Sequence, residues 1–284
     1  MSVTHDLRSI AVITGACGGM GVACARLLGR RYRLALTDIR PAPLTDLAEA
    51  LAREGYALAA CVAGDLADPA TTAALAAAVQ EAGSLRSLVH TAGLSPALAG
   101  WEAILRANLV ATEHLLAAFE PQLTRGTVAV LIASMAGHLT PADPDIDALL
   151  DAPLAEDFLQ RVAPHLQRLS RPDDAHGAAS PAYGMSKRAV IRMVERRAPA
   201  WGRHGARIVS ISPGTIWTPM GRTEADTNPA AAAVVAATPV GRWGTAMDIA
   251  NAVDFLSSDL AGFITGCDLR IDGGVTPALA GATF

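Results

Sequence analysis

Short apolar runs alternate with longer alanine-rich segments along most of this sequence, and this alternation constrains the fold more than any other feature. Near-continuous runs of Val, Ile and Leu are typical of strands that are buried on both faces of a parallel sheet. The segments between them are long enough to be the helices that connect such strands. We predict strands over Arg8–Thr14, Tyr32–Thr37, Ala57–Val62, Leu85–Thr91, Thr127–Ala133, Arg207–Ser212 and Cys267–Ile271, and helices over Gly19–Arg31, Leu44–Glu54, Thr71–Ala82, Trp101–Phe119 and Ala246–Ser257 and from about Pro181.

This order predicts an α/β protein with a doubly wound, Rossmann-type parallel sheet, in which residues 1–284 form a single domain. The interval 140–179 breaks the alternation, because it is acidic and its apolar residues from Leu154 to Leu169 recur at helical spacing. We therefore expect a helical insertion there, made of a polar loop with a solvated acidic face and an amphipathic helix. A calcium loop from Asp143 is excluded, because Ala148 and Leu154 stand where glycine and glutamate are needed. No metal site is expected.

Charge and hydropathy exclude several classes of protein. The chain has 23 Lys and Arg against 27 Asp and Glu, so a basic surface for nucleic acid is not expected. Its apolar runs are all far shorter than the roughly 20 residues that span a membrane. We see no secretion signal at the start of the chain, and the four cysteines are scattered, as is typical of reduced thiols. These observations predict a cytoplasmic protein without a nucleic-acid or membrane partner.

A glycine-rich segment, TGACGGMG over Thr14–Gly21, joins the first predicted strand to the first predicted helix. Glycines let backbone N–H groups approach a pyrophosphate, although an ordinary glycine-rich turn is the alternative. Asp38 ends the second predicted strand, near the place where a carboxylate binds the ribose of a dinucleotide. Such a carboxylate repels a 2′-phosphate and so favours NAD over NADP, while Arg40 offers a guanidinium to that phosphate. The alternative role for Asp38 is a solvated strand end.

Tyr183 and Lys187 are separated by one helical turn, so their side chains share a face of the helix predicted from Pro181. A nearby ammonium stabilises a phenolate and lowers the pKa of the tyrosine. The pair is therefore able to exchange a proton with an alcohol or a ketone.

Together these motifs resemble those of the short-chain dehydrogenases/reductases in their short single-domain form. The match to the family's order of motifs runs from Ser9 to Gly274. Besides the TGxxxGxG loop and the YxxxK pair, the matching segments are Gly64-Asp65-Leu66, His90-Thr91-Ala92-Gly93 (where the family has NNAG), Asn108 in RANLVAT, Ser134 in IASMAG, the PGxxxT segment Pro213–Thr218 and the closing Ile271-Asp272-Gly273-Gly274.

The resemblance implies hydride transfer between a secondary alcohol and a ketone with a nicotinamide cofactor. Tyr183 would be the general acid/base, Ser134 would bind the substrate oxygen, Lys187 would hold the ribose, and Asn108 would position a water behind Lys187. The implied cofactor-binding residues are Thr14, Gly15, Cys17, Gly18, Gly19, Met20, Gly21, Asp38, Ile39, Asp65, Leu66, Thr91, Ala92, Gly93, Lys187, Pro213, Gly214, Ile216 and Thr218. The implied substrate pocket contains Ser95, Ser134, His138, Tyr183, Trp217 and Met220, beside a substrate loop over residues 215–240.

Ser134 and Tyr183 are 49 residues apart, far more than is usual in the family, and the extra residues are the insertion. The insertion is similar to one in bacterial 3α-hydroxysteroid dehydrogenase/carbonyl reductases, which implies an apolar or cyclic alcohol or ketone as substrate. It either roofs the substrate cleft or blocks a helix–helix interface between subunits, and the two roles are compatible. The resemblance also implies a homodimer or a homotetramer.

Two other functions are compatible with most of these motifs. An epimerase or dehydratase would retain NAD and act through a keto intermediate, but that branch usually has a TGxxGxxG loop and a longer C-terminal part. A catalytically silent NAD(H) sensor would tend to lose the tyrosine or the lysine, whereas this chain has Asn108, Ser134, Tyr183 and Lys187 together.

Overall fold

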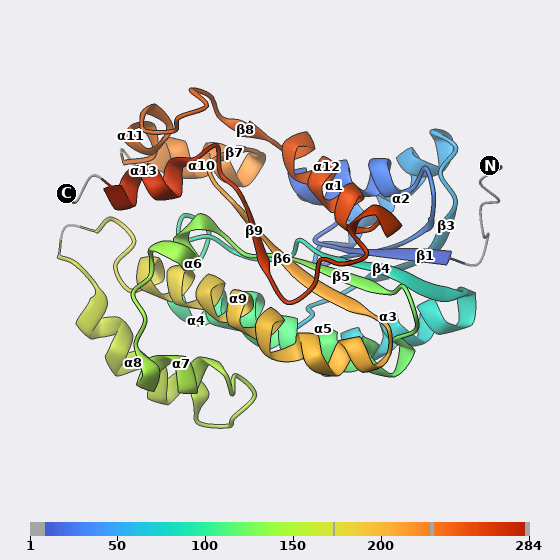
Figure 1. Ribbon diagram of the computed structural model, residues 1–284, viewed down its shortest axis with the longest axis horizontal. Helices are drawn as coiled ribbons and strands as arrows, with labels where there is room; N and C mark the ends of the chain where they lie inside the picture. Colours follow the sequence, from blue (N-terminus) through green and yellow to red (C-terminus); the bar gives the residue numbers. More distant parts are fainter. Residues whose placement is uncertain (1–8, 173, 228–229, 282–284) are drawn as a thin grey trace.

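The computed structural model describes residues 9–172, 174–227 and 230–281, so Arg8 of the first predicted strand, residue 173 of the insertion and residues 228–229 of the substrate loop lie outside it. Seven parallel strands form the central sheet in the order β3-β2-β1-β4-β5-β6-β9 (Figure 1). This is the doubly wound, single-domain arrangement that the sequence predicts. The strands are β1 (Ser9–Thr14), β2 (Arg33–Asp38), β3 (Leu58–Ala63), β4 (Ser84–His90), β5 (Val128–Ile132), β6 (Arg207–Pro213) and β9 (Asp268–Ile271), with β7 (Ile216–Trp217) and β8 (Gly244–Thr245) in a small separate sheet.

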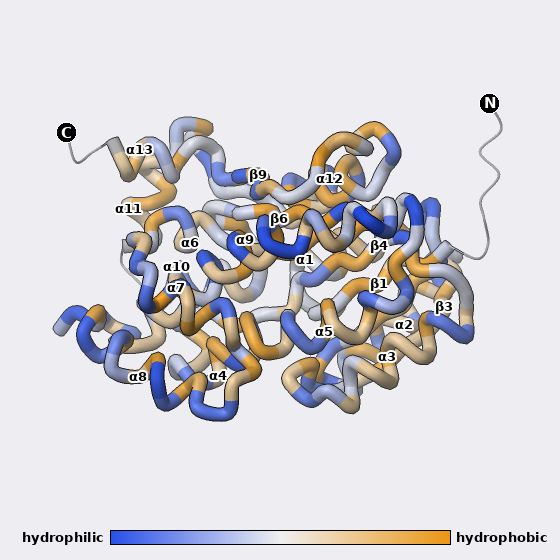
Figure 2. Tube along the Cα trace, turned by 60° about the horizontal axis from the view of Figure 1, so that its bottom comes forward, coloured by the Kyte–Doolittle hydropathy of each residue, from blue (hydrophilic) through white to orange (hydrophobic). Residues whose placement is uncertain are grey.

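Helices cover both faces of the sheet (Figure 1). One core cluster joins the sheet to α3, α5 and α9 and contains Phe119 and Trp201, and the other joins it to α1, α2 and α12 and contains Leu28 and Val253. Figure 2 shows hydrophobic strands running through the middle of the molecule. The helices are α1 (Gly19–Leu28), α2 (Pro41–Arg53), α3 (Pro69–Ala82), α4 (Trp101–Leu105), α5 (Ala111–Phe119), α6 (Met135–Leu139), α7 (Pro144–Leu150), α8 (Phe158–Leu169), α9 (Ala179–Arg203), α10 (Pro219–Thr227), α11 (Ala230–Ala236), α12 (Ala246–Leu256) and α13 (Val275–Gly281).

The single helix predicted over Trp101–Phe119 is interrupted. A π-helical turn over Arg106–Val110 lies between α4 and α5. Such a turn inserts an extra residue into the helix, and these insertions are frequent at functional sites. No proline or glycine marks the interruption in the sequence, so the pattern of apolar residues alone does not reveal it. Asn108 lies in this turn.

The insertion differs from its prediction in two ways. Its first part is the helix α7 rather than a polar loop, because the Asp143 carboxylate accepts hydrogen bonds from the amides of Asp145 and Ile146, at 3.1 and 3.3 Å, and Pro144 opens the helix. The second part is the expected amphipathic helix, α8, with Phe158 buried. Both helices lie beside α9, on its outer side (Figure 1).

Asp147 of α7 and Asp151 at its C-terminal end are paired with arginines, which corrects the second expectation for these two residues, whereas Asp145 is exposed. Arg188 donates two hydrogen bonds to Asp147, at 2.9 and 2.8 Å, and Arg192 donates one of 2.6 Å to Asp151, which also pairs with Arg196. The three arginines stand one turn apart along one face of α9. We call these five residues the acid–arginine clasp. It fixes the insertion to the helix that carries Tyr183.

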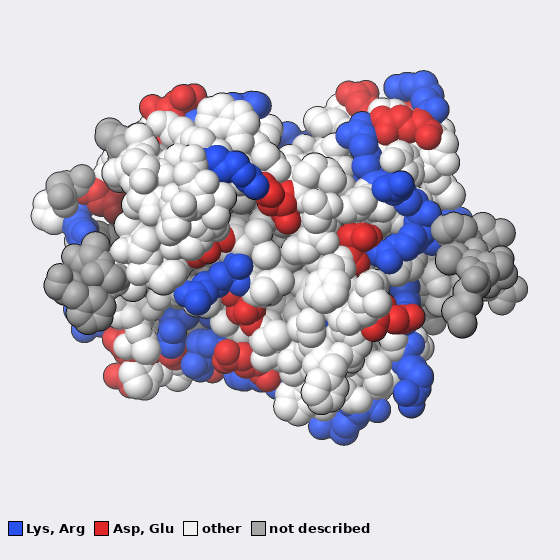
Figure 3. All heavy atoms as spheres, turned by 45° about the horizontal axis from the view of Figure 1, so that its top comes forward, with Lys and Arg blue, Asp and Glu red and all other residues white. Residues whose placement is uncertain are grey.

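Acidic and basic side chains are interspersed on the face of the molecule shown in Figure 3. Within the described residues, none of the helices is both long and apolar enough to cross a membrane.

Candidate active site

Two adjoining cavities open at the carboxyl edge of the sheet, where the strand order reverses between β1 and β4. Ligands of open α/β sheets bind at such a point. The first cavity has a volume of about 500 Å³ and the second about 360 Å³. Molecules bound in the two would be in contact, because the cavities share the lining residues Met20, Thr91, Gly93, Leu94, Thr218 and Met220.

The glycine-rich loop forms one wall of the first cavity. Gly15 has a φ of +58°, and a Cβ there would lie 2.7 Å from the Ala92 amide nitrogen, so this position requires glycine. A Cβ on Gly21 would lie 2.3 Å from the Gly15 carbonyl oxygen. Helix α1 has no side-chain cap and no acidic residue in its first turn. The loop therefore presents the positive end of a helix dipole to the cavity and is able to bind a pyrophosphate.

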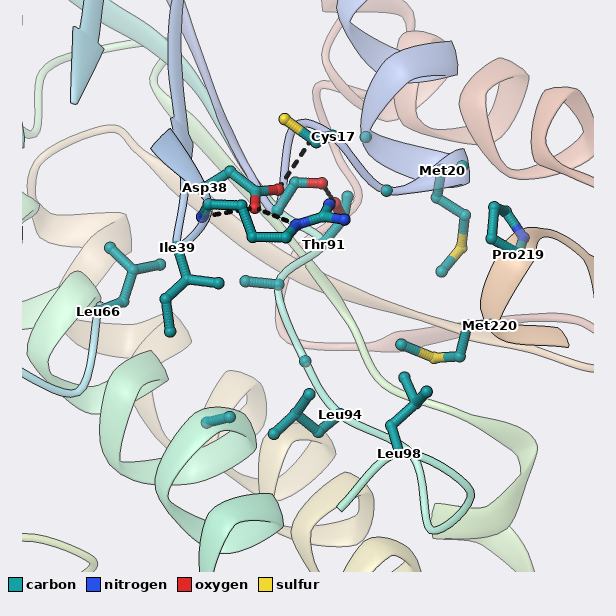
Figure 4. Close-up of a pocket in the computed structure, with 18 of the residues that line it drawn as sticks. Cys17, Met20, Asp38, Ile39, Leu66, Thr91, Leu94, Leu98, Pro219 and Met220 are labelled. Carbon is teal, nitrogen blue, oxygen red and sulfur yellow. Dashed lines mark hydrogen bonds and ion pairs between the residues drawn. The ribbon is translucent and has the colours of Figure 1, made fainter. Parts of the chain in front are cut away.

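Asp38 lies at one end of this cavity with Cys17, whereas Met20, Pro219 and Met220 lie on the opposite side (Figure 4). The Asp38 carboxylate is 6% exposed; it accepts a 3.0 Å bond from the Cys17 amide and bonds of 3.1 and 3.0 Å from the amide and Nε of Arg40. Burial raises the pKa of Asp38, but these hydrogen bonds and the Arg40 charge outweigh it, so the pKa lies below its ordinary value. Asp38 is thus an anion at neutral pH.

Most of the other predicted cofactor residues also line the cavities. The first cavity is lined by Gly15, Cys17, Gly18, Gly19, Met20, Gly21, Asp38, Ile39, Asp65, Leu66, Thr91, Ala92, Gly93 and Thr218, and the second by Lys187, Pro213, Gly214 and Ile216. Thr14 is the exception, because it is fully buried and lines neither cavity.

Thr14 belongs instead to a buried chain of hydrogen bonds through His90. Thr112 donates its hydroxyl proton to the Asn108 carbonyl oxygen at 2.8 Å. Since that proton is used, His90 Nε2 must donate to Thr112 Oγ1 at 2.8 Å, and His90 Nδ1 accepts from Thr14 Oγ1 at 2.7 Å. Burial, and then the Lys187 charge, lower the pKa of His90 to about 3, so the ring is neutral. His90 thereby connects the start of the glycine-rich loop to the π-helical turn.

Three of the four predicted catalytic side chains meet at the second cavity. Tyr183 and Lys187 enter it from α9, and Ser134 enters it from the N-terminus of α6, with a hydrogen bond between Ser134 and Tyr183. Lys187 Nζ donates to the Ile132 carbonyl oxygen at 2.8 Å and lies 5.7 Å from the centre of the Tyr183 ring.

The fourth, Asn108, lies behind the cavity wall. Its Oδ1 accepts from the Leu94 amide at 2.8 Å, and its Nδ2 donates to the Leu94 carbonyl oxygen at 3.0 Å and to Ser186 Oγ at 3.1 Å. The side chain is therefore engaged with the protein itself. Its effect in this structure is to fix Leu94, which lines both cavities.

The pKa of Tyr183 differs from its prediction. Burial raises it, the Ser134 hydrogen bond lowers it and the Glu224 carboxylate raises it, and the net pKa lies above the ordinary value of a tyrosine. The lowering expected from Lys187 is not found. Burial lowers the pKa of Lys187 to about 8. The tyrosine is accordingly neutral and able to donate its proton.

Two predicted pocket residues, His138 and Trp217, do not line the second cavity, whereas Ser95 and Met220 do. His138 Nε2 lies 2.8 Å from Oδ2 of Asp268, a buried carboxylate that needs a partner. Trp217 follows the buried Ile216 in the strand β7, so the alternation of side chains turns it outward, and it is 49% exposed.

Among the lining residues of the second cavity that the sequence reasoning missed are Trp243 and Glu224. Trp243 packs against Trp217 with 5.0 Å between ring centres and lines the cavity just beyond the predicted substrate loop. Glu224 lines it from α10, within that loop. An acidic residue in a predicted substrate loop was the available signal for Glu224.

Two family descriptions match this chain, one in its N-terminal half and one in its C-terminal half. The family described as short chain dehydrogenase matches residues 9–143, and the one described as Enoyl-(Acyl carrier protein) reductase matches residues 173–276.

Several curated proteins are similar over almost the whole chain. The chain is 31% identical to a short-chain dehydrogenase/reductase, bsc3, of Alternaria brassicicola, covering 96% of this chain and 97% of the relative. It is 32% identical to D-threitol dehydrogenase of Mycolicibacterium smegmatis, covering 97% of each chain. It is 28% identical to 3-alpha-hydroxysteroid dehydrogenase/carbonyl reductase of Comamonas testosteroni, covering 97% of this chain and 100% of the relative.

Solved structures agree with the fold. A 3-oxoacyl-[acyl-carrier protein] reductase with bound NAD from Brucella melitensis gives a TM-score of 0.71 at 24% identity, covering 95% of this chain and 92% of that one. An NADP complex of RhlG from Pseudomonas aeruginosa gives 0.72 at 24% identity, covering 94% and 96%.

Proposed function

Because this chain belongs to the short-chain dehydrogenase/reductase family, an enzyme family that acts on CH–OH groups with a nicotinamide cofactor, we propose that it interconverts a secondary alcohol and a ketone with NAD. The observation that supports this most is that Ser134, Tyr183 and Lys187 meet at a cavity adjoining the glycine-rich loop. The nicotinamide supplies or accepts the hydride when it is bound.

Each side chain has a distinct task in this proposal. Ser134 donates a hydrogen bond to the substrate oxygen and stabilises the charge that develops there. Tyr183 donates a proton to the oxygen of a ketone, or takes one from an alcohol in the reverse direction. Lys187, with a pKa lowered to about 8, still carries a positive charge at neutral pH, 5.7 Å from the centre of the Tyr183 ring, and holds the cofactor ribose.

The preference for NAD is proposed from Asp38. Its carboxylate is ionised and lines the first cavity, where it can accept hydrogen bonds from ribose hydroxyls and repel a 2′-phosphate. The Nε of Arg40 already donates a hydrogen bond to Asp38, so the Arg40 charge balances that of the Asp38 carboxylate and is less available to a 2′-phosphate. The glycines of the loop allow it to pack closely against Ala92 and Thr218 beside the first cavity.

An apolar or cyclic alcohol or ketone is the proposed substrate, because Leu94, Ile132, Ile216, Met220 and Trp243 supply much of the wall of the second cavity. The relatives act on compounds as different as D-threitol and a hydroxysteroid, to judge from their names, so similarity does not select the substrate.

A homo-oligomer in the cytoplasm completes the proposal. Leu260 and Phe263 are fully or largely exposed just before the edge strand β9, where they would be covered in an oligomer. The insertion covers part of α9, so a helix–helix interface along that face would be restricted. All four cysteines are free thiols, as is typical of a reducing compartment.

The test is a Tyr183→Phe variant, assayed for NAD-linked oxidation of cyclic alcohols and titrated with NADH by fluorescence. Turnover should fall by at least ~100-fold, the usual contribution of general acid–base catalysis, while NADH binding persists. Unchanged turnover would refute the assignment. Product formation without accumulation of NADH would favour the epimerase or dehydratase, and NADH binding by the unmodified protein with no turnover would favour the sensor.

A further inference from the structure

The second cavity contains two polar groups that the proposed hydride transfer does not use, the carboxylate of Glu224 and the hydroxyl of Ser95. Among the residues that line the cavity, Lys187 and Glu224 carry the charged side chains. Lys187 is bonded to the Ile132 carbonyl oxygen and belongs to the proposed catalytic group. Glu224 therefore supplies the negative charge in a cavity whose wall is otherwise largely apolar.

Glu224 lines the same cavity as Ser134 and Tyr183. It projects from α10, and it lies near enough to Tyr183 for its charge to raise the pKa of that tyrosine. A charged acceptor such as the Glu224 carboxylate, in the same cavity as the proton donor Tyr183, discriminates between substrates, because it attracts hydrogen-bond donors and repels anions.

Ser95 provides an independent observation. Its side chain is 5% exposed, and its Oγ has no hydrogen-bond partner among the residues that the structure describes. Buried hydroxyls are nearly always paired, so an unpaired one in a cavity wall indicates a partner that comes with the ligand. The cavity, at about 360 Å³, is small enough for one ligand to reach both Ser95 and Glu224.

We propose that Glu224 and Ser95 form a subsite for a second hydroxyl group of the substrate. The hydroxyl donates to the Glu224 carboxylate and accepts from Ser95 Oγ, so the buried Ser95 hydroxyl gains a partner. The preferred substrates are then cyclic diols and the corresponding hydroxyketones, and carboxylated analogues are rejected. This proposal rests on the proposed function and narrows its substrate class.

The test compares cyclohexanol with the 1,2-, 1,3- and 1,4-cyclohexanediols at saturating NAD, which differ by one hydroxyl. The ratio of kcat/KM for the best diol to that for cyclohexanol is the measured quantity. It should exceed one in the unmodified enzyme and fall ~10- to 100-fold in Glu224→Gln, as expected for loss of a hydrogen bond to a charged acceptor. Ser95→Ala should lower it ~3- to 10-fold, since it removes a neutral hydrogen bond.

A matched control is Asp226→Asn, which removes a charge from an exposed position of the same helix that lines neither cavity. This variant should keep the ratio of the unmodified enzyme. A second readout is the pH profile: in Glu224→Gln, the ionisation of Tyr183 should move to lower pH, because a carboxylate that raises its pKa is gone.

The two proposals fail differently. If the enzyme oxidises the alcohols with NAD but Glu224→Gln leaves the diol ratio unchanged, the subsite is refuted and the proposed function stands. If no alcohol of any kind supports NAD reduction, the proposed function is refuted and the subsite with it.

Discussion

Replacing Asp38 with Asn should invert the choice between the two nicotinamide dinucleotides. The substitution keeps the shape of the side chain and removes its charge. In the structure the carboxylate is nearly buried, with one oxygen bonded to the Cys17 amide and the other to Arg40. Asn has one acceptor oxygen, so it can keep the bonds from Arg40 or the bond from the Cys17 amide but not both, and the unfolding control below checks whether the loop stays intact.

The magnitude follows from two effects. Hydrogen bonds from the ribose to a charged acceptor are worth roughly 1.5–3 kcal/mol against 0.5–1.5 kcal/mol for a neutral one, so NADH should bind ~1–2 kcal/mol more weakly. A 2′-phosphate about 5 Å from the carboxylate is repelled by about 3 kcal/mol per unit charge at an effective dielectric constant near 20. Arg40 offsets part of this, which leaves a gain of ~2–3 kcal/mol for NADPH. The ratio of the two dissociation constants should therefore change by roughly 10² to 10³·⁵.

The assay is a pair of fluorescence titrations, with NADH and with NADPH, for the unmodified protein and for Asp38→Asn. Arg40→Ala serves as the companion variant, since it should weaken NADPH binding more than NADH binding. Thermal unfolding of both variants checks that the loop is intact. A ratio that changes less than about threefold would show that the ribose does not lie at Asp38, and the reasoning would then be wrong.

Two further changes test other parts of the structure. Burial lowers the pKa of Lys187 from 10.5 to about 8. Between pH 8 and pH 10.5 the folded protein therefore binds fewer protons than the unfolded chain. The buried charge destabilises the folded protein fully below pH 8, and this destabilisation fades as the pH rises to 10.5. Lys187→Met should abolish turnover yet raise the free energy of unfolding by up to ~3 kcal/mol at pH 7, with a smaller gain at pH 10. Urea unfolding at the two pH values measures the gain, and an equal gain at both would contradict the expectation. Asp147→Asn should lower the free energy of unfolding by ~1–3 kcal/mol and speed hydrogen exchange over Pro144–Leu150, because Arg188 and Arg192 lose a carboxylate. The control is Asp145→Asn, at an exposed position of the same helix, which should change neither quantity. Equal exchange in the two variants would count against the clasp.

The sheet and the glycine-rich loop were predictable because each depends on local chemistry. A strand buried on both faces must be apolar along its whole length, as Ile10–Ile13 is, and the close approach at Gly15 and Gly21 admits only glycine. The spacing of Tyr183 and Lys187 places them on one helix face wherever that helix lies. These features need no knowledge of distant contacts.

The features that the sequence did not reveal depend on tertiary pairing. The outward orientation of Trp217 follows from the pairing of β7 with β8, 28 residues away. Asp147 was expected to be solvated because nothing near it in the sequence indicates that Arg188 lies opposite. The role of Asn108 likewise depends on Leu94 and Ser186, which the π-helical turn brings within reach.

The insertion also has a consequence for how the chain folds. It lies in the crossover from β5 to α9, between Ile132 and Ala179, and so lengthens the loop that must close before β5 and β6 pair. Loop-closure entropy grows only with the logarithm of length, and the insertion roughly doubles the connection from Ile132 to Arg207, so it costs about 0.6 kcal/mol. A single arginine–carboxylate pair of the clasp is of that order. The crossover is therefore a place where evolution can add or exchange whole segments at little thermodynamic cost, provided that their two ends still deliver Ser134 and Tyr183 to the same cavity.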